Sequence, residues 1–191
     1  KIMEGFGQTE TTLSIANLVG TEPKLGSMGK KTPFFNVVLL NPEGKVCKEG
    51  EVGEICIKTD SKDVCGLFLG YYHDQEKTDE VWYDGYYHTG DQATCDADGY
   101  FWYVGRIDDV IKSSGYRIGP FEIESVIMEL PYVLEVAVTA APDPVRGQVV
   151  KATVVLPKAT PESEEMPKKI QNDVQEHTAP YKHPSRVASI A

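Results

Sequence analysis

The chain has 191 residues and a formal net charge of −10 at pH 7; 41% of its residues are hydrophobic and 25% are charged. These proportions are typical of a soluble globular protein with one large or two small domains. The negative charge argues against a nucleic-acid-binding protein, because no broad basic surface offsets it. No apolar run approaches the roughly 20 residues that span a bilayer, and no signal-peptide pattern is seen, so we expect a cytoplasmic protein.

The four cysteines give no pattern of a zinc site. None of them forms a Cys-x-x-Cys pair, and no histidine stands at metal-ligand spacing to them in the sequence. We expect reduced, partly buried thiols, as in proteins of the cytosol. The four residues are Cys47, Cys56, Cys65 and Cys95.

Short strands and turns are predicted for the first hundred residues. Residues 5–10, Gly-Phe-Gly-Gln-Thr-Glu, are expected to form a glycine-rich loop. After this loop, β-rich runs are separated by turn signals such as Asn-Pro-Glu-Gly. Strands are predicted over residues 35–40, 53–58 and 100–104, with a short helix over 76–82. The region is therefore expected to be a small β-barrel or two packed sheets.

The pattern changes after residue 109. Residues 109–112 and 116–118 are predicted to pair as a hairpin across Ser113-Ser114-Gly115. A helix follows from Gly119 and Pro120, with glutamates in its first turn and apolar residues at helical spacing. Strands over 133–140 and 148–156 and a second amphipathic helix over 162–178 complete the segment. This order of elements predicts a compact α+β domain.

The predicted fold class is therefore α+β, with a β subdomain followed by a smaller α+β domain. The subdomain covers residues 1–104, and the second domain covers residues 110–191. The boundary between them falls in residues 105–109, where two adjacent aspartates follow a Gly-Arg pair. The chain begins directly in a site-like loop, from which we expect a piece of a longer protein.

Four motifs occur in order along the chain. They are Gly5-Phe6-Gly7-Gln8-Thr9-Glu10, Tyr87-His88-Thr89-Gly90-Asp91, Gly105-Arg106 through Glu124, and Asp143-Pro-Val-Arg-Gly147 followed by Val150-Lys-Ala152. Together they resemble the adenylate-forming acyl-CoA synthetase superfamily, and most of all its medium-chain and acetyl-CoA-synthetase-like branch. The resemblance covers essentially the whole chain. It implies a ligase that converts a short- or medium-chain carboxylic acid and ATP to acyl-AMP, and then transfers the acyl group to coenzyme A.

The resemblance places ATP or AMP against the first motif. Gly5 and Gly7 would let the backbone approach a flat ring, and Phe6 would offer an aromatic face to adenine. Thr9 would hydrogen-bond the α-phosphate, and Glu10 would be a hard oxygen ligand for Mg²⁺. From this loop alone, a plain glycine-rich turn with a capping threonine is an equal alternative.

Two further residues are implied to hold the nucleotide. Asp91 would accept hydrogen bonds from the two vicinal ribose hydroxyls, and Arg106 would bind the ribose or phosphate side through its fork of donors. The alternative for Asp91 is a turn aspartate at a strand end. The alternative for Arg106 is a surface ion pair with Asp108 or Asp109.

The same resemblance makes residues 105–109 a hinge and the second domain mobile. Asp108 is implied to be the pivot on which that domain rotates between the two half-reactions. A loop after it would reach coenzyme A, with Arg117 supplying charge for a phosphate group. This loop consists of Ser114, Gly115, Tyr116 and Arg117. Arg146 would contact the phosphates of coenzyme A as well, or else be an exposed turn arginine.

Two parts of the family pattern are not found in the chain. They are the Ser/Thr/Gly-rich phosphate loop, which lies upstream in the family, and the downstream segment with the catalytic lysine. We therefore expect this polypeptide to be inactive in adenylation. Apolar surface around Leu13, Ile15, Leu18 and Val19 is expected to be exposed, mobile or covered by a neighbouring chain, for example in a homo-oligomer. The alternatives are a non-catalytic nucleotide- or CoA-binding module, an adenylation domain that loads a carrier protein, or a luciferase-like oxidase.

Overall fold

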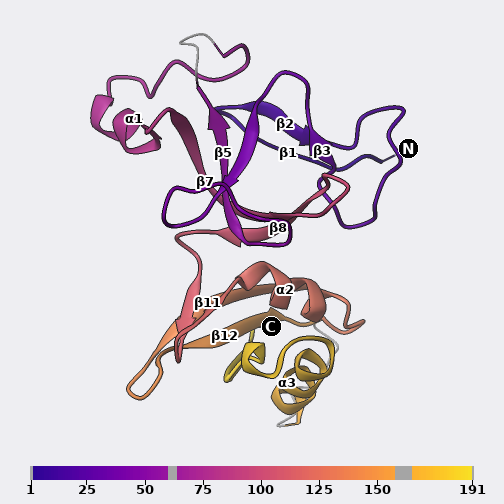
Figure 1. Ribbon diagram of the computed structural model, residues 1–191. Coiled ribbons are helices and arrows are strands. Elements are labelled where there is room, and N and C mark those ends of the chain that lie inside the picture. Colours follow the sequence, from indigo (N-terminus) through magenta and orange to yellow (C-terminus); the bar gives the residue numbers. More distant parts are fainter. Residues whose placement is uncertain (1, 60–63, 158–164, 191) are drawn as a thin grey trace. The chain divides into compact units, whose positions relative to one another are not determined.

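The chain divides into two units, residues 1–107 and residues 108–191, and each is described by itself. The computed structural model describes residues 2–59, 64–157 and 165–190 (Figure 1). Within these residues there are three α-helices and three small sheets, so the predicted α+β class is confirmed. In the part of the chain so described, no helix has the length and apolar character needed to cross a membrane.

The first unit contains two antiparallel sheets. One has the order β1-β2-β3, and the other has the order β4-β5-β7-β6 with β8 paired to β7. Two backbone hydrogen bonds join the sheets, from Met28 to Phe101 and from Phe101 to Gly29. The elements are β1 (Gly5–Gln8), β2 (Thr12–Ala16), β3 (Lys30–Lys31), β4 (Val37–Leu40), β5 (Gly53–Lys58), α1 (Gln75–Val81), β6 (Trp82–Tyr83), β7 (Tyr86–Cys95) and β8 (Phe101–Arg106).

Alternating strand residues form the core of this first unit. Ile55 and Ile57 on β5 are fully buried, and so is Ile15 on β2. They pack with buried residues of the neighbouring strands, among them Val37, Leu39, Tyr87, Ala93 and Phe101. The strand predicted over 53–58 is confirmed, whereas β4 begins at Val37, two residues after the predicted start.

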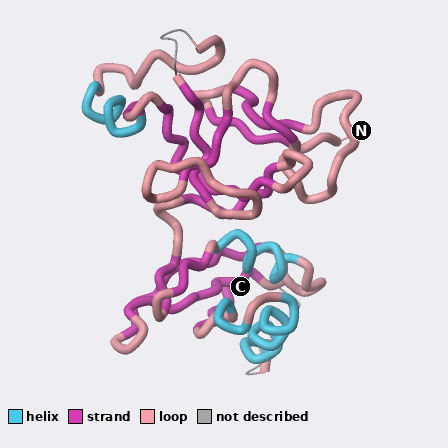
Figure 2. Tube along the Cα trace, viewed as in Figure 1, coloured by secondary structure: helices cyan, strands magenta, loops and turns pink. Residues whose placement is uncertain are grey.

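The second unit is one five-stranded sheet with two helices. Strand order is β10-β9-β12-β11, and β13 pairs in parallel with β12. Most of the helical residues of the chain lie in this unit (Figure 2). Its elements are β9 (Ile111–Ser113), β10 (Tyr116–Ile118), α2 (Pro120–Met128), β11 (Glu135–Asp143), β12 (Gly147–Val155), α3 (Met166–His177), the 3₁₀ turn η1 (Pro180–Lys182) and β13 (Arg186–Ile190).

Both helices pack their apolar faces into one core with this sheet. Ile123 and Ile127 of α2, and Ile170 and Val174 of α3, are fully buried beside Val154 of β12. Pro120 stands at the start of α2, where its fixed φ suits a helix and its missing N–H costs nothing. The hairpin and the two helices predicted here are confirmed, although residues 162–164 of the second predicted helix lie outside the described residues. The first strand of the hairpin is Ile111–Ser113 in place of 109–112, so Ser113 belongs to the strand and not to the turn.

Candidate functional site

The glycine-rich segment expected to be a loop is mostly a strand. Residues Gly5–Gln8 form β1, which pairs antiparallel with Thr12–Ala16. Only residues 9–11 form the connecting turn, so the prediction of a loop over 5–10 was wrong. The turn is fixed by fully buried Thr11, whose hydroxyl accepts from Gln8 N at 3.0 Å and donates to Thr12 O at 2.9 Å. Thr9 is exposed at this turn and Glu10 is half-buried.

Gly7 has a structural reason to be glycine. The pairing of β1 with β2 is irregular between Phe6 and Gly7, and a Cβ at Gly7 would lie 2.1 Å from Thr12 O. No side chain fits at that distance. Thr12 itself has φ 52°, a left-handed conformation that a β-branched residue rarely adopts. The bulged hairpin therefore accounts for this glycine without any ligand.

Asp91 lies inside strand β7 and is nearly buried, with 5% exposure. Its Oδ2 accepts a hydrogen bond from Gln8 Nε2 at 2.6 Å, and its Oδ1 accepts one from the Tyr103 hydroxyl at 2.9 Å. Arg106 Nη1 lies 3.7 Å from Oδ2. The carboxylate is thus oriented by neutral donors on two other strands, with a cation beside it. The alternative of a turn aspartate at a strand end was wrong, because β7 continues to Cys95.

Gln8 is itself held in one orientation. Its Oε1 accepts from the Tyr87 hydroxyl at 2.8 Å, and its Nε2 also donates to Thr89 O at 2.9 Å. Burial raises the pKa of Tyr87, so this phenol stays protonated and remains a donor. The amide is therefore fixed with its nitrogen toward Asp91.

Glu10 has a tyrosine partner. Tyr71 donates its phenolic hydrogen to Glu10 Oε1 at 3.0 Å. Burial, and then this hydrogen bond, raise the pKa of Tyr71, which keeps the donor intact. The Glu10 carboxylate fits Mg²⁺ as a ligand, since the ion is typically held by one or two carboxylates together with substrate phosphates and waters.

The other residues predicted to hold the nucleotide lie near Asp91. Phe6 is half-buried on β1 and stacks with Tyr103, with ring centroids 6.4 Å apart and an interplanar angle of 30°. Arg106 is exposed at the end of β8, and a Cβ at Gly90 would lie 3.2 Å from its Nη2. The first unit thus gathers Gly5 through Glu10, Asp91 and Arg106 around one strand hairpin and the centre of β7.

The residues predicted to bind coenzyme A form a second group, inside the second unit. Ser114 and Gly115 connect β9 to β10, with φ of 49° and 85°. Positive φ at both positions is the pattern of a type I′ turn, which suits a two-residue hairpin. Ser114 N donates to Arg146 O at 3.3 Å, so this turn lies next to the Asp143–Gly147 turn.

Tyr116, Arg117 and Arg146 present exposed side chains in this group. Tyr116 stacks on Tyr181 with ring centroids 4.2 Å apart and an interplanar angle of 12°. Arg146 Nη1 donates to Ser185 Oγ at 3.4 Å, and the arginine lines a cavity of about 500 Å³ with His183. Asp108 is the first residue of the second unit, and its role as a pivot stays a prediction.

Several residues that order the site were not singled out from the sequence. Gln8 was part of a motif but had no assigned role, and Tyr71, Tyr87 and Tyr103 were assigned none either. Tyr71, Tyr87 and Tyr103 each donate to a residue of the first group. Sequence spacing gave little indication of these contacts. Tyr71 and Tyr87 each lie more than 60 residues along the chain from the residue to which they donate, and Tyr103 lies 12 residues from Asp91.

The apolar residues expected on the surface are only partly exposed. Leu13, Leu18 and Val19 are 50%, 38% and 91% exposed, whereas Ile15 is fully buried. The expectation was wrong for Ile15, because its side chain packs in the first unit's core with Ile55 and Phe101. Association of copies through this surface stays a prediction.

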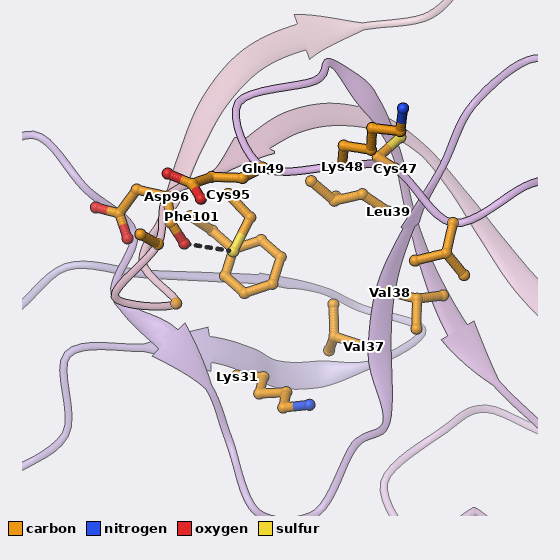
Figure 3. Close-up of a pocket in the computed structure, with 13 residues that line it drawn as sticks. Lys31, Val37, Val38, Leu39, Cys47, Lys48, Glu49, Cys95, Asp96 and Phe101 are labelled. Carbon is orange, nitrogen blue, oxygen red and sulfur yellow. Dashed lines mark hydrogen bonds between the residues drawn. The ribbon is translucent and has the colours of Figure 1, made fainter.

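A separate cavity of about 440 Å³ lies elsewhere in the first unit (Figure 3). Val37, Leu39 and Phe101 form its apolar wall, and Cys47 and Cys95 line it as free thiols. Cys95 Sγ lies 3.6 Å from the backbone oxygen of Asp96. None of the residues predicted to bind the nucleotide lines this cavity, so it is no part of the site around Asp91.

Comparison with known proteins places this geometry in a family. Residues 1–72 match the AMP-binding enzymes, and residues 122–191 match the C-terminal domain of AMP-binding enzymes. The chain belongs to the AMP-binding enzyme family. The first match contains β1, its turn and Tyr71, and the second contains α2 from Glu122 onward, Arg146 and Tyr181.

Similar proteins agree on the family and are longer than this chain. The mitochondrial acyl-coenzyme A synthetase ACSM3 of Rattus norvegicus is 46% identical over 191 residues, covering 99% of this chain and 33% of its own. The uncharacterized acyl–CoA ligase YtcI of Bacillus subtilis is 46% identical over 190 residues, 100% of this chain and 35% of its own. The chain therefore spans about a third of the length of these relatives.

A solved structure shares the fold. The crystal structure of ATP-bound MatB from Rhodopseudomonas palustris aligns with a TM-score of 0.85 and 30% sequence identity. The alignment covers 99% of this chain and 36% of that protein.

Proposed function

We propose that this chain is part of an acid–CoA ligase. In the first half-reaction the carboxylate of the acid attacks the α-phosphate of ATP, which gives acyl-AMP and pyrophosphate. In the second, the thiol of coenzyme A attacks the acyl carbon, which gives the thioester and releases AMP. The names of the two relatives and the ATP in the MatB structure support this proposal. The observation that carries it is the oriented carboxylate of Asp91 beside Arg106.

Asp91 suits the recognition of a ribose. Two vicinal hydroxyls are donors that a carboxylate can accept together, and a carboxylate offers about four acceptor positions. Gln8 and Tyr103 supply one hydrogen bond to each oxygen, which fixes the plane of the carboxylate before a ligand arrives. Such preorganisation lowers the cost of ordering the site on binding. Arg106 would hold the ribose or the phosphate side of the same nucleotide.

The turn after β1 would meet the phosphates. Thr9 is exposed there and can donate to the α-phosphate, and Glu10 is held by Tyr71. Mg²⁺ bound at Glu10 would supply charge neutralisation for the phosphate oxygens. The task of Tyr71 is then to keep the Glu10 carboxylate in place.

The second unit would serve coenzyme A. Ser114, Gly115, Tyr116 and Arg117 form an exposed turn and strand, and Arg146 lies at the neighbouring turn. Arginine binds phosphate oxygens through paired donors, so Arg117 and Arg146 suit the phosphates of coenzyme A. Asp108 would be the pivot about which this unit rotates between the first and the second half-reaction.

The proposed substrate is a short- or medium-chain fatty acid, and the proposed location is the cytoplasm. We further propose that the 191 residues alone do not adenylate an acid, since they correspond to about a third of the length of the relatives. In that case the chain by itself is a nucleotide- and CoA-binding module. The presence of both residue groups in one chain favours this second function for the isolated polypeptide.

Two assays together test the proposal. Pyrophosphate release is measured from ATP with acetate, butyrate or octanoate, for this chain and for the protein encoded by its complete reading frame. Turnover by the longer protein only is the expected result. Calorimetry of the 191-residue chain with AMP, ATP and coenzyme A should give binding. Absence of turnover in the longer protein would refute the ligase proposal, and absence of all binding would refute the module.

A further inference from the structure

Three buried or partly buried side chains to which no role was assigned above converge in the first unit. They are Glu54 and Cys56 on β5 and His88 on β7, and their ligand atoms all lie within 4.8 Å of one another. We propose that this Glu54–Cys56–His88 cluster binds a divalent cation of the zinc class. The proposal is independent of the ligase function.

Strand pairing creates the cluster. Cys56 lies directly opposite His88 in the antiparallel pairing of β5 with β7, and Glu54 is two residues earlier, on the same face of β5. The register of the pair shifts between Glu54 and Cys56, at the position of Gly90 with φ 74°. The shift turns the backbone of Gly90 toward Glu54. Sequence spacing did not reveal the cluster, because 32 residues separate Cys56 from His88.

A second contact orients the glutamate. Gly90 N donates to Glu54 Oε1 at 3.0 Å, and Glu54 Oε2 lies 2.9 Å from His88 Nδ1. One oxygen is therefore anchored to the backbone while the other faces the histidine. Ligating carboxylates in metal sites are typically hydrogen-bonded in this way by a neighbouring group.

The distance between Cys56 and His88 suits a tetrahedral ion. With Zn–S of about 2.3 Å and Zn–N of about 2.0 Å, the sulfur and nitrogen ligands of one zinc stand about 3.5 Å apart. Cys56 Sγ lies 3.5 Å from His88 Nδ1. The 2.9 Å between Glu54 Oε2 and His88 Nδ1 would open by a few tenths of an ångström, which a rotation of the exposed part of the glutamate allows.

The arrangement does not suit a catalytic Cys-His-acid triad. In such a triad the nucleophile and the acid contact opposite nitrogens of the imidazole, so that the ring passes a proton between them. Here Cys56 and Glu54 both contact Nδ1, whereas Nε2 is buried and has no hydrogen-bond partner among the described residues. Cys56 is also fully buried, out of reach of a substrate. Three ligand atoms within 4.8 Å of one another fit an ion better than a proton relay.

Charge balance supports the same conclusion. A thiolate and a carboxylate carry two negative charges, which a divalent cation neutralises, and neutral histidine adds none. Binding of the cation would release the proton of the Cys56 thiol, because a thiolate is the form that ligates a metal. The Glu54 and His88 side chains keep 16% and 10% exposure, which gives an ion and a completing water a way in. Tyr83 covers the histidine ring, with stacked centroids 3.7 Å apart.

Cobalt(II) is the probe for this site, because a cobalt–thiolate bond has its own charge-transfer absorption in the near ultraviolet. The chain is freed of metal with a chelator and titrated with Co²⁺. We expect one ion per chain with the thiolate band, displacement of Co²⁺ by Zn²⁺, and a higher melting temperature with either ion. The Cys56→Ser variant should lose the band, and His88→Gln should bind Co²⁺ more weakly.

Cys65→Ser is the matched control, since Cys65 is an exposed thiol in the same unit and should leave the band unchanged. Circular dichroism of the metal-free variants shows whether each one folds. If Cys56→Ser does not fold, the weaker Co²⁺ binding expected of His88→Gln still tests the site. A titration without a thiolate band in the folded wild-type chain would overturn the proposal. So would a band that survives in folded Cys56→Ser or disappears in Cys65→Ser.

Discussion

The side-chain nitrogen of Gln8 donates a 2.6 Å hydrogen bond to Oδ2 of Asp91, across 83 residues of sequence. The bond joins the β1 hairpin to strand β7, and with Tyr103 it fixes the carboxylate that we assign to the ribose. Tyr87 donates to the oxygen of the same amide, and the amide nitrogen also donates to Thr89 O. A positioning role for Gln8 in nucleotide binding follows from this network.

Replacing Gln8 with alanine should therefore weaken AMP binding about tenfold, as expected for the loss of one hydrogen bond to a charged group. Calorimetry of the chain with AMP measures the change. Gln75→Ala on the exposed surface of α1 is the matched control and should bind AMP as the wild type does. If Gln8→Ala binds AMP with the same affinity as the wild type, Gln8 has no positioning role in nucleotide binding.

Gly7→Ala should destabilise the first unit by about 3 kcal/mol, because the new Cβ would lie 2.1 Å from Thr12 O and the hairpin must shift. Gly44→Ala is the control: no atom of the described residues lies within 4 Å of a Cβ there, and only the strain of its positive φ remains, about 1 kcal/mol. Urea unfolding followed by tryptophan fluorescence reports on this unit alone, since both tryptophans, Trp82 and Trp102, belong to it. Similar midpoints for the two variants would show that the hairpin tolerates a side chain at Gly7.

An ion pair of Lys24 gives the first unit a pH dependence in acid. Lys24 Nζ lies 2.6 Å from Asp96 Oδ2, and its hydrogen bond lowers the pKa of Asp96 from 3.8 to about 2. A carboxylate whose pKa is lowered by folding stabilises the fold above its unfolded pKa, and this contribution is lost as pH falls through the folded value. Stability should therefore fall between about pH 4 and pH 2.

Lys24→Met should raise the pKa of Asp96 and flatten that fall in stability. Carbon-13 NMR titration of the Asp96 carboxyl and urea unfolding at several pH values measure the two effects. Lys45→Met, at the exposed turn after β4, removes the same charge elsewhere and should change neither. An Asp96 pKa that does not move in Lys24→Met would contradict the ion pair.

Substitutions in the second unit should weaken the binding of coenzyme A without changing the binding of AMP, which we assign to the first unit. Arg146→Gln removes an exposed cation of the second unit and should weaken coenzyme A binding about tenfold while AMP binding stays unchanged. Lys168→Gln on α3 is the control for charge, since it is exposed and lies outside both groups. If Lys168→Gln weakens coenzyme A binding as much as Arg146→Gln does, the effect is one of net charge.

The sequence predicted best the elements that local pattern determines. Alternating residues identified β5, and Pro120 after Gly119 identified the start of α2, because both signals lie within a few residues. Residues Gly5–Gln8 were taken for a loop, since two glycines normally argue against a strand. Their strand depends on pairing with Thr12–Ala16 and on the bulge that Gly7 permits.

Convergence of distant side chains could not be predicted from spacing. The motifs in the sequence pointed to Asp91 and Arg106, but they assigned no role to the neighbouring Tyr87 and Tyr103. The contacts of Tyr87 and Tyr103 depend on the order in which the strands pair. The same is true of the contact between Cys56 and His88. Strand β13 was missed for the same reason, since its parallel partner β12 lies more than 30 residues earlier.

The central claim, that Asp91 recognises ribose hydroxyls, is tested by comparing two ligands that differ only there. Calorimetry is run with AMP and with 2′,3′-dideoxy-AMP, on the wild-type chain and on Asp91→Asn. The wild type should prefer AMP by about tenfold or more, and Asp91→Asn should bind both ligands equally weakly. Equal binding of the two ligands by the wild type, or an undiminished preference in Asp91→Asn, would contradict the account.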